Sequence, residues 1–385
     1  MNDIQQDQLK KWWESLVGFG PRVMGSNGAK EAVNYLIHEL NHLGIAVEIQ
    51  SFTYPGWELV SFSELYMESP VGEMIESYPA LGSPGGKVVQ GRLVEIGESV
   101  IWDMYNWPRF GVFAQDGNIA AYISARQGGK ALSQTLIMSH NSKPHLFVGE
   151  DTYRRWQEEL NQQKEIRVSF ELEVIQTPNK EGQNICVKFS ANPIPKEVKP
   201  FKIIIGAHYD TMYNTKGAYD NTSGVAVLLA LIQWLQNQKL PFQIECVFFG
   251  AEEFALAGSN AFVEKLTKSE WEEIDLMINL DGFGRGEELE CWVGADWLEQ
   301  MIWQKLNSNR LFPRWKMKSP PPPGSDHTPF FKKGIPVVMF TVNDQEIIHS
   351  ERDIPNRFIF LNMMKALEFL KGFLSQDLLE FKGEV

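Results

Sequence analysis

Five separate segments in the second half of this sequence each supply a histidine or a carboxylate next to an apolar run. The residues are His208 and Asp210 after KIIIGA, Asp220 before NTSGVAVLLAL, Glu252 and Glu253 after CVFFGA, Asp281 after LMINL, and His349 after VVMFTVNDQEII. Imidazole and carboxylate groups bind borderline metal ions, and a carboxylate can also act as a general base. These residue types at these spacings therefore predict metal-assisted chemistry.

Each residue also has an ordinary structural explanation when it is taken alone. Asp220 or Asn221 could cap the helix that follows. The paired glutamates could be first-turn acids that complement a helix dipole. The aspartate before Gly282 could be a turn residue, and a lone histidine on a loop is usually solvated. Because these explanations would have to coincide in several places, one shared site is the better interpretation.

Two histidines and three carboxylates, one of which bridges, suit a pair of zinc ions. A bridging carboxylate holds two ions about 3.5–4 Å apart, so both contact one hydroxide. A base is also needed, because a proton must leave the water and later reach the leaving group. One of Glu252 and Glu253 is therefore expected to be a ligand and the other the base. Asp210 follows His208 closely enough to accept the other N–H of its imidazole and fix the tautomer.

The elements that must position these residues alternate between strands and helices from residue 165 onward. The apolar runs are RVSFELEVI, NICVKF, KIIIGA, QIECVFFG, DLMINL and GIPVVMFTV, and the helical stretches lie near 223–238, 259–268, 295–307 and 356–375. This alternation predicts an α/β fold, a three-layer sandwich with a mixed, largely parallel central sheet. Ligand chemistry in such sheets lies beyond the carboxyl ends of the strands.

The first half of the chain has a different texture. Residues 4–18 and 27–44 show helical spacing, with Gly44 as a C-terminal cap, and residues 45–52 alternate like a strand. Short strand-like runs separated by Gly, Ser, Asn and Pro then follow. We therefore predict a catalytic domain built from residues 1–55 and 172–385, interrupted by an inserted β-rich module at 56–171.

The composition of the chain limits the kinds of binding partner and the cellular location that we expect. The 385 residues are 43% hydrophobic and 22% charged, with a net charge of −13. Because no basic cluster offsets that charge, we expect no binding to nucleic acid or to a membrane. The start of the chain lacks the pattern of a secretory signal, and no apolar run reaches about 18 residues. Cys186, Cys246 and Cys291 cannot all pair, so we expect a cytoplasmic location.

The motifs GAHYDT, AYDNTSGVA, GAEE, NLDG and IHSERD, in this order, resemble the zinc-dependent aminopeptidases related to bacterial leucyl aminopeptidase and aminopeptidase Y. The resemblance covers roughly residues 180–375, and GPRVMGSNGAKEAVNYLIHEL also resembles the opening segment of that family. It implies two zinc ions per chain, with His208 and Asp281 on one ion, Glu253 and His349 on the other, Asp220 bridging and Glu252 as general base. It also implies that the Asp220–Asn221 peptide bond is cis.

The resemblance further implies an activity. The chain is expected to hydrolyse the N-terminal peptide bond of peptides that have a free N-terminus, through a hydroxide bound by both zinc ions. SDHTPFFKKGIP is similar to a family segment near the site, which makes Asp326 and His327 candidate supporting residues. The inserted module occupies the position of the protease-associated domain of many members, and DGNIAAYISARQGG is similar to one of its strands. The oligomeric state is not indicated.

Three other functions remain open at this stage. A glutaminyl cyclase resembles this scaffold and works with one zinc ion. A carboxypeptidase or a dipeptidase would use the same scaffold on other peptides. A metal-free peptide-binding protein is the alternative outside enzymes, but such proteins tend to lose ligands, whereas all five ligand positions are filled here.

Overall fold

A mixed sheet forms the centre of the molecule. The computed structural model describes residues 3–102, 104–135, 142–192 and 201–378. Outside the inserted module, the sheet has the strand order β14-β13-β15-β12-β10-β11-β9, with β1 paired to β9. The strands are β1 Glu48–Phe62, β9 Arg167–Phe189, β10 Phe201–His208, β11 Phe242–Phe249, β12 Ile274–Phe283, β13 Glu288–Val293, β14 Arg314–Lys318 and β15 Val337–Val342. Strands β11, β10, β12 and β15 are parallel, while β9 and β13 join them antiparallel. The predicted mixed, largely parallel sheet is confirmed.

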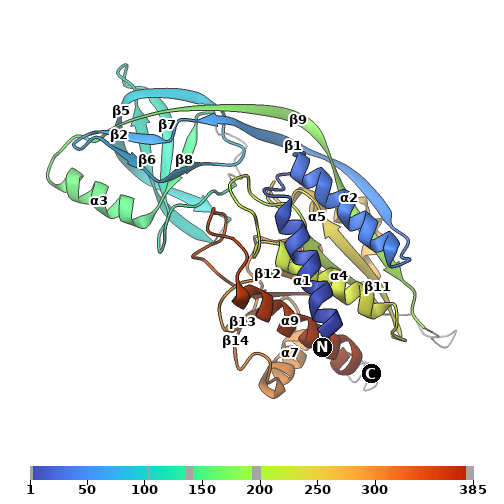
Figure 1. Cartoon of the computed structure of the whole chain (residues 1–385). Coiled ribbons are helices and arrows are strands. Elements are labelled where there is room, and N and C mark those ends of the chain that lie inside the picture. Colours follow the sequence, from blue (N-terminus) through green and yellow to red (C-terminus); the bar gives the residue numbers. More distant parts are fainter. Residues whose placement is uncertain (1–2, 103, 136–141, 193–200, 379–385) are drawn as a thin grey trace.

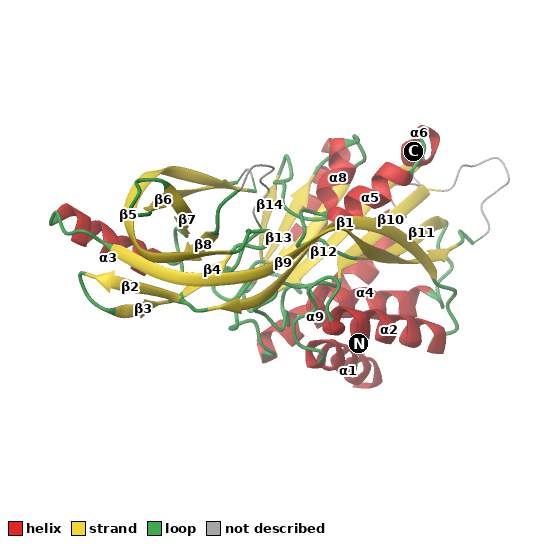
Figure 2. Ribbon diagram, turned by 90° about the horizontal axis from the view of Figure 1, so that it is seen from above, coloured by secondary structure: helices red, strands yellow, loops and turns green. Residues whose placement is uncertain are grey.

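Helices cover both faces of this sheet (Figure 2). One face carries α1 Asp3–Gly18, α2 Asn27–His42, α4 Thr222–Leu235, α7 Asp296–Ser308 and α9 Arg357–Gly372, which continues as a π-helix over Phe373–Asp377. The other face carries α5 Ala257–Lys265, α6 Lys268–Glu272 and α8 His327–Lys332. Ile203 and Ile205 of β10 belong to the first core, and Ile204 between them belongs to the second. Because successive strand side chains face opposite sides, burial of both faces explains the uninterrupted apolar run.

The inserted module is a second β-rich lobe with a core of its own (Figure 1). Its elements are β2 Leu65–Ser69, β3 Glu73–Ile75, β4 Ser77–Pro79, β5 Gly86–Ile101, β6 Tyr105–Phe113, β7 Ile119–Ala125, β8 His145–Val148 and α3 Glu150–Asn161. Phe110 packs edge-on against Trp156 at 5.3 Å between ring centres in that core. The lobe therefore has its own apolar interior.

Two long strands connect the lobes (Figures 1 and 2). Strands β1 and β9 pair antiparallel from Glu48↔Cys186 to Phe62↔Leu172. The runs RVSFELEVI and NICVKF, taken separately in the sequence, are thus one strand, because the polar residues between them also pair with β1. The predicted junctions at 55/56 and 171/172 fall inside these strands, and the division into domains stays a prediction.

Two further observations bear on the expectations from composition. Cys186, Cys246 and Cys291 are free and buried. No helix in the described ranges has the length and apolar character needed to cross a membrane. The cytoplasmic location stays a prediction.

Helix α4 gives a direct test of the core. Leu228 is fully buried between this helix and the sheet. We predict that Leu228→Ala lowers the free energy of unfolding by about 2–5 kcal/mol, because it removes buried methyl groups and leaves a cavity. Ile4→Ala on α1 is the control, since Ile4 is 79% exposed. Denaturant titration measures both, and equal effects of the two substitutions would contradict this packing.

Candidate metal centre

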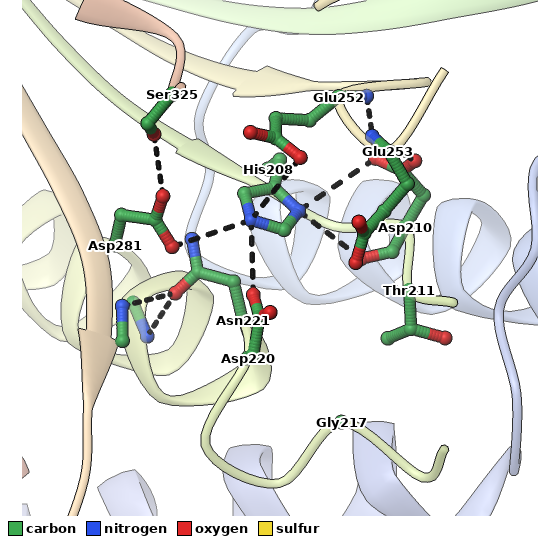
Figure 3. A network of polar contacts seen from close by, with 12 residues as sticks. His208, Asp210, Thr211, Gly217, Asp220, Asn221, Glu252, Glu253, Asp281 and Ser325 are labelled. Carbon is green, nitrogen blue, oxygen red and sulfur yellow. Dashed lines mark hydrogen bonds and ion pairs between the residues drawn. The ribbon is translucent and has the colours of Figure 1, made fainter. Parts of the chain in front are cut away.

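The predicted site residues meet at the carboxyl-terminal edge of the parallel strands. Figure 3 labels all of them except His349. His208 is the last residue of β10, and Asp281 lies near the end of β12. Asp220 precedes Asn221, the N-cap of α4. Glu252 and Glu253 lie in the loop between β11 and α5, and His349 lies in the loop after β15. Segments that are far apart in the sequence thus converge where the sheet topology predicts a ligand site.

Asp220 lies between the two histidines. Its Oδ1 is 3.2 Å from Nε2 of His208, and its Oδ2 is 3.0 Å from Nε2 of His349. Oδ1 of Asp281 lies 3.4 Å from the first imidazole, and Oε2 of Glu253 lies 3.3 Å from the second. Possible ligand atoms of His208, Glu252 and Asp281, and of Asp220, Glu253 and His349, lie within 4.8 Å of one another in each group. The Asp220 carboxylate therefore lies between the two groups, with one oxygen facing His208 and the other facing His349.

The tautomers of both histidines suit metal binding. Nδ1 of His208 lies 3.1 Å from the backbone oxygen of Asp210, and Nδ1 of His349 lies 3.2 Å from the backbone oxygen of Ser133. Because a carbonyl oxygen can only accept, both Nδ1 atoms carry a hydrogen. In a neutral imidazole the lone pair is then on Nε2, the atom that faces Asp220. Each histidine therefore presents a ligand atom to the centre.

Buried negative charge dominates the electrostatics of the centre. Burial raises the pKa of Glu253 to about 8, despite the opposing effect of His349. Burial also raises the pKa of Glu252 well above its usual value. Burial alone lowers the pKa of His349, but Glu253 and Asp220 raise it to about 9. Neither carboxylate oxygen of Glu253 has a hydrogen-bond donor. A set of closely spaced carboxylates and imidazoles, in which the Glu253 carboxylate has no hydrogen-bond donor, fits divalent cations such as zinc.

The carboxylate of Asp210 binds the backbone of Glu252 and Glu253, whereas the prediction placed it on the imidazole of His208. Its carboxylate lies 3.8 Å from Nδ1 of His208, which bonds to its backbone oxygen instead. The carboxylate accepts the backbone N–H of Glu252 at 3.1 Å and of Glu253 at 3.2 Å. The two oxygens of the Asp210 carboxylate thus fix the loop that carries Glu252 and Glu253. The backbone oxygen of Asp210 fixes the imidazole of His208.

The loop with the glutamates is not the start of a helix. Helix α5 begins only at Ala257. Ala251, Ala255 and Leu256 have φ values of 55°, 58° and 61°, in the left-handed region that residues other than glycine rarely adopt. Such backbone costs of order 1–3 kcal/mol per residue and persists where surrounding contacts fix it, often at functional sites. The first-turn explanation of Glu252 and Glu253 is therefore wrong.

Asn221 takes the structural role that was open for Asp220. Its side chain accepts the N–H of Gly224 in α4 and of Gly282 in β12, and it donates to the oxygen of Leu280 at 2.9 Å. The Asp220–Asn221 peptide bond is cis, as the resemblance implied. Asn221 therefore ties the start of α4 to β12 and leaves the Asp220 carboxylate free to face the histidines.

Sequence reasoning did not assign three supporting residues. Both oxygens of Asp353 accept backbone N–H groups, from Tyr219 at 2.7 Å and Asp220 at 3.0 Å. Ser325 donates to the carboxylate of Asp281. Asp353 lies within the motif IHSERD, so the motif could have indicated it. Ser133 comes from the inserted module, where no motif marks it.

Asp326 and His327 are the two candidate supporting residues. Asp326 is fully buried, and burial is the main cause that raises its pKa to about 7. Nε2 of His327 lies 2.9 Å from the oxygen of Pro322, and its ring meets Trp292 edge-on at 5.8 Å between ring centres. Neither residue belongs to the two groups of possible ligands.

A cavity opens onto the centre. Its walls come from both lobes and are rich in apolar side chains, including Trp102, Trp107 and Leu132 of the inserted lobe and Trp292, Met339 and Ile348 of the catalytic lobe. His208, Asp220, Glu252, Asp281 and His349 lie at its base. An apolar cavity with a few convergent polar groups is typical of a small-ligand site.

Among curated proteins, the chain is similar to aminopeptidase YwaD of Bacillus subtilis (strain 168). The two are 25% identical over 351 residues, which cover 85% of this chain and 73% of that protein.

Solved structures share the fold. The aminopeptidase from Aneurinibacillus sp. strain AM-1 matches with a TM-score of 0.71 at 20% identity over 96% of this chain and 93% of its own. BSAP, a zinc aminopeptidase from Bacillus subtilis, matches with a TM-score of 0.70 at 18% identity over 96% and 94%. The glutaminyl cyclase of Porphyromonas gingivalis matches less well, with a TM-score of 0.52 at 16% identity over 95% and 97%.

Residues 184–368 match Peptidase family M28. This range contains all members of the two ligand groups, from His208 to His349. The match of this segment to Peptidase family M28 agrees with the resemblance noted in the motifs.

Proposed function

We propose that this chain is an aminopeptidase that uses two zinc ions to remove the N-terminal residue of peptides. The observation that carries the proposal is the position of Asp220, whose two carboxylate oxygens each face the Nε2 atom of a different histidine. A carboxylate that bridges two ions needs this arrangement. His208 and Asp281 would hold one ion, and Glu253 and His349 the other. The relatives with zinc and aminopeptidase in their names support the metal and the reaction.

Zinc at these positions would lower the pKa of a coordinated water and stabilise the negative charge that develops on the scissile carbonyl oxygen. Glu252 would accept the proton of the attacking water and transfer it to the departing amine. Its Oε2 lies 4.0 Å from Nε2 of His208, farther than the facing oxygens of Asp220 and Asp281. That greater distance favours a base over a ligand. Hydrogen bonding of the Glu252 backbone N–H to Asp210 would keep the base in place.

The apolar cavity walls suggest the side chain that is accepted. Trp102, Trp107 and Trp292 would surround the first residue of the substrate. Burial of a larger apolar side chain contributes about 0.8 kcal/mol per methylene. We therefore expect large apolar N-terminal residues to be preferred over small or charged ones.

A single-zinc glutaminyl cyclase is the nearest alternative. The second ligand group of Asp220, Glu253 and His349 is complete and buried, which favours two ions. The fold match to the cyclase is also weaker than that to the aminopeptidases. The number of zinc ions per chain in purified protein separates the two functions.

Glu252→Gln tests the proposed base. The substitution keeps the size of the side chain but removes its basicity, so we predict retained zinc and a kcat lowered by about 10²–10⁴-fold or more. Elemental analysis and steady-state kinetics on the same preparation measure both quantities. Near-normal kcat would refute the role of Glu252, and loss of one zinc ion would assign it as a ligand instead.

A panel of chromogenic aminoacyl substrates tests the reaction itself. We predict hydrolysis that a chelator abolishes and zinc restores, with leucyl and phenylalanyl substrates cleaved about tenfold or more faster than alanyl or aspartyl ones. Acetylation of the substrate amine should stop cleavage by an aminopeptidase. Cleavage of acetylated peptides would favour a carboxypeptidase, while peptide binding without bound metal or turnover would favour the non-enzymatic alternative.

The stability of the metal-free protein should depend on pH. The pKa of His349 rises from 6.5 to about 9 on folding, so its stabilising contribution is complete below pH 6.5 and is lost as the pH rises through about 9. The pKa of Glu253 rises from 4.5 to about 8, so the folded protein keeps a proton that the unfolded chain has released, and stability again falls with rising pH. We predict that the Tm in chelator falls from pH 7 to 9.

Saturating zinc should suppress this decline, because zinc replaces the protons on these groups. Calorimetry at several pH values with chelator and with zinc measures both curves. A Tm in chelator that stays level or rises across this range would contradict the charge balance described for the centre.

A further inference from the structure

A segment of the inserted lobe, Ala131 to Thr135, reaches into the metal centre. Ser133 is fully buried, and Leu81 N–H donates to the oxygen of Gln134 at 2.9 Å. The side chain of Arg352, on the loop after His349, donates to the oxygen of Ala131 at 3.0 Å. The segment is therefore fixed at both lobes.

Ser133 forms a reciprocal contact with His349. Its backbone oxygen is the partner of Nδ1 of His349 at 3.2 Å, and its own N–H donates to the backbone oxygen of His349 at 3.1 Å. The Ser133 hydroxyl lies 3.2 Å from the same oxygen and 2.7 Å from Oδ1 of Asn214, whose amide also donates to His349. His349 has a φ of 50°, and these bonds hold it in that left-handed conformation.

Thr135 fixes the other ligand of the same group. Its hydroxyl donates to the backbone oxygen of Glu253. Since the carboxylate oxygens of Glu253 have no hydrogen-bond donor, the direction of that side chain depends on its backbone. Thr135 on one side and Asp210 on the other hold this backbone.

The other ligand group is supported differently. His208 uses the backbone oxygen of Asp210, and Asp281 uses the hydroxyl of Ser325. Both supports come from the catalytic lobe. In the part of the chain that the structure describes, the inserted lobe thus supports the Glu253 and His349 ligands, and the catalytic lobe supports the His208 and Asp281 ligands.

We propose that the inserted lobe controls one of the two metal sites, with Ser133 and Thr135 as positioning residues for the ion held by His349 and Glu253. This inference rests on the proposed two-ion centre. Groups that orient metal ligands typically affect metal affinity by about 10–100-fold. Loosening the segment should therefore weaken one ion selectively, while the ion held by His208 and Asp281 stays bound.

The test is zinc binding by chelator-stripped protein. Titration in competition with a chromophoric chelator gives the number of ions and the affinity of each. We expect two ions in the unsubstituted chain. Ser133→Ala/Thr135→Val keeps the backbone contacts of Ser133 with His349 but removes the two hydroxyls that hold the segment to Asn214 and to the backbone oxygen of Glu253. We expect one ion of unchanged affinity and one weakened about 10–100-fold in this variant. Ser124→Ala is the matched control, because it removes another buried hydroxyl of the inserted lobe, bonded to Ser99 and His145. That control should bind both ions normally.

Ser325→Ala identifies the second ion. It removes the support of Asp281, so it should weaken the ion that the first variant leaves tight. Combining it with Ser133→Ala/Thr135→Val should then weaken both. If the double variant does not fold, as judged by circular dichroism, Thr135→Val alone keeps the side-chain shape and should show the same selectivity.

The outcomes separate this inference from the proposed function. Two ions in the unsubstituted chain, with both unaffected or both weakened equally in the Ser133 and Thr135 variants, would overturn the role of the inserted lobe alone. A single ion in the unsubstituted chain would overturn the two-ion proposal and this inference with it.

Discussion

The structure depends on a concentration of buried carboxylates that the protein alone does not neutralise. Asp220, Glu252 and Glu253 are buried, Asp281 is partly buried, and all four face two imidazoles. Without cations, these groups can be buried only by sharing protons, which is why the pKa values of Glu253 and His349 are both raised. Two divalent cations would balance four carboxylate charges and leave the imidazoles neutral. This cluster of carboxylates and imidazoles is therefore suited to binding cations.

The scaffold achieves this by placing each ligand at the end of a different rigid element. Parallel strands bring their carboxyl ends to one edge of the sheet. Strand β10 is buried on both faces, and this burial fixes the position of His208 at its end. Backbone groups then orient the side chains: carbonyl oxygens set both imidazole tautomers, and the carboxylate of Asp210 receives two loop amides. The inserted lobe completes the arrangement through Ser133 and also supplies part of the cavity wall.

Local patterns in the sequence were sufficient for the layers and for the residues that meet at the centre. Apolar runs marked β10, β11, β12 and β15, and the polar residues after them marked the site. Contacts between residues far apart in the sequence could not be predicted from these local patterns. The exposed, polar residues between the two runs of β9 gave no strand signal, because pairing with β1 makes them extended. Asp210 was assigned to the imidazole by proximity in the chain, whereas the loop amides are its partners in space. Nothing near Ser133 indicates that it touches His349.

We propose that these side chains hold two cations, one on either side of Asp220. Anomalous diffraction at the zinc absorption edge, from crystals grown with zinc, tests it most directly. We predict two peaks, one next to His208 and Asp281 and one next to Glu253 and His349, with the Asp220 carboxylate between them. A single peak, or strong peaks only elsewhere on the chain, would contradict it.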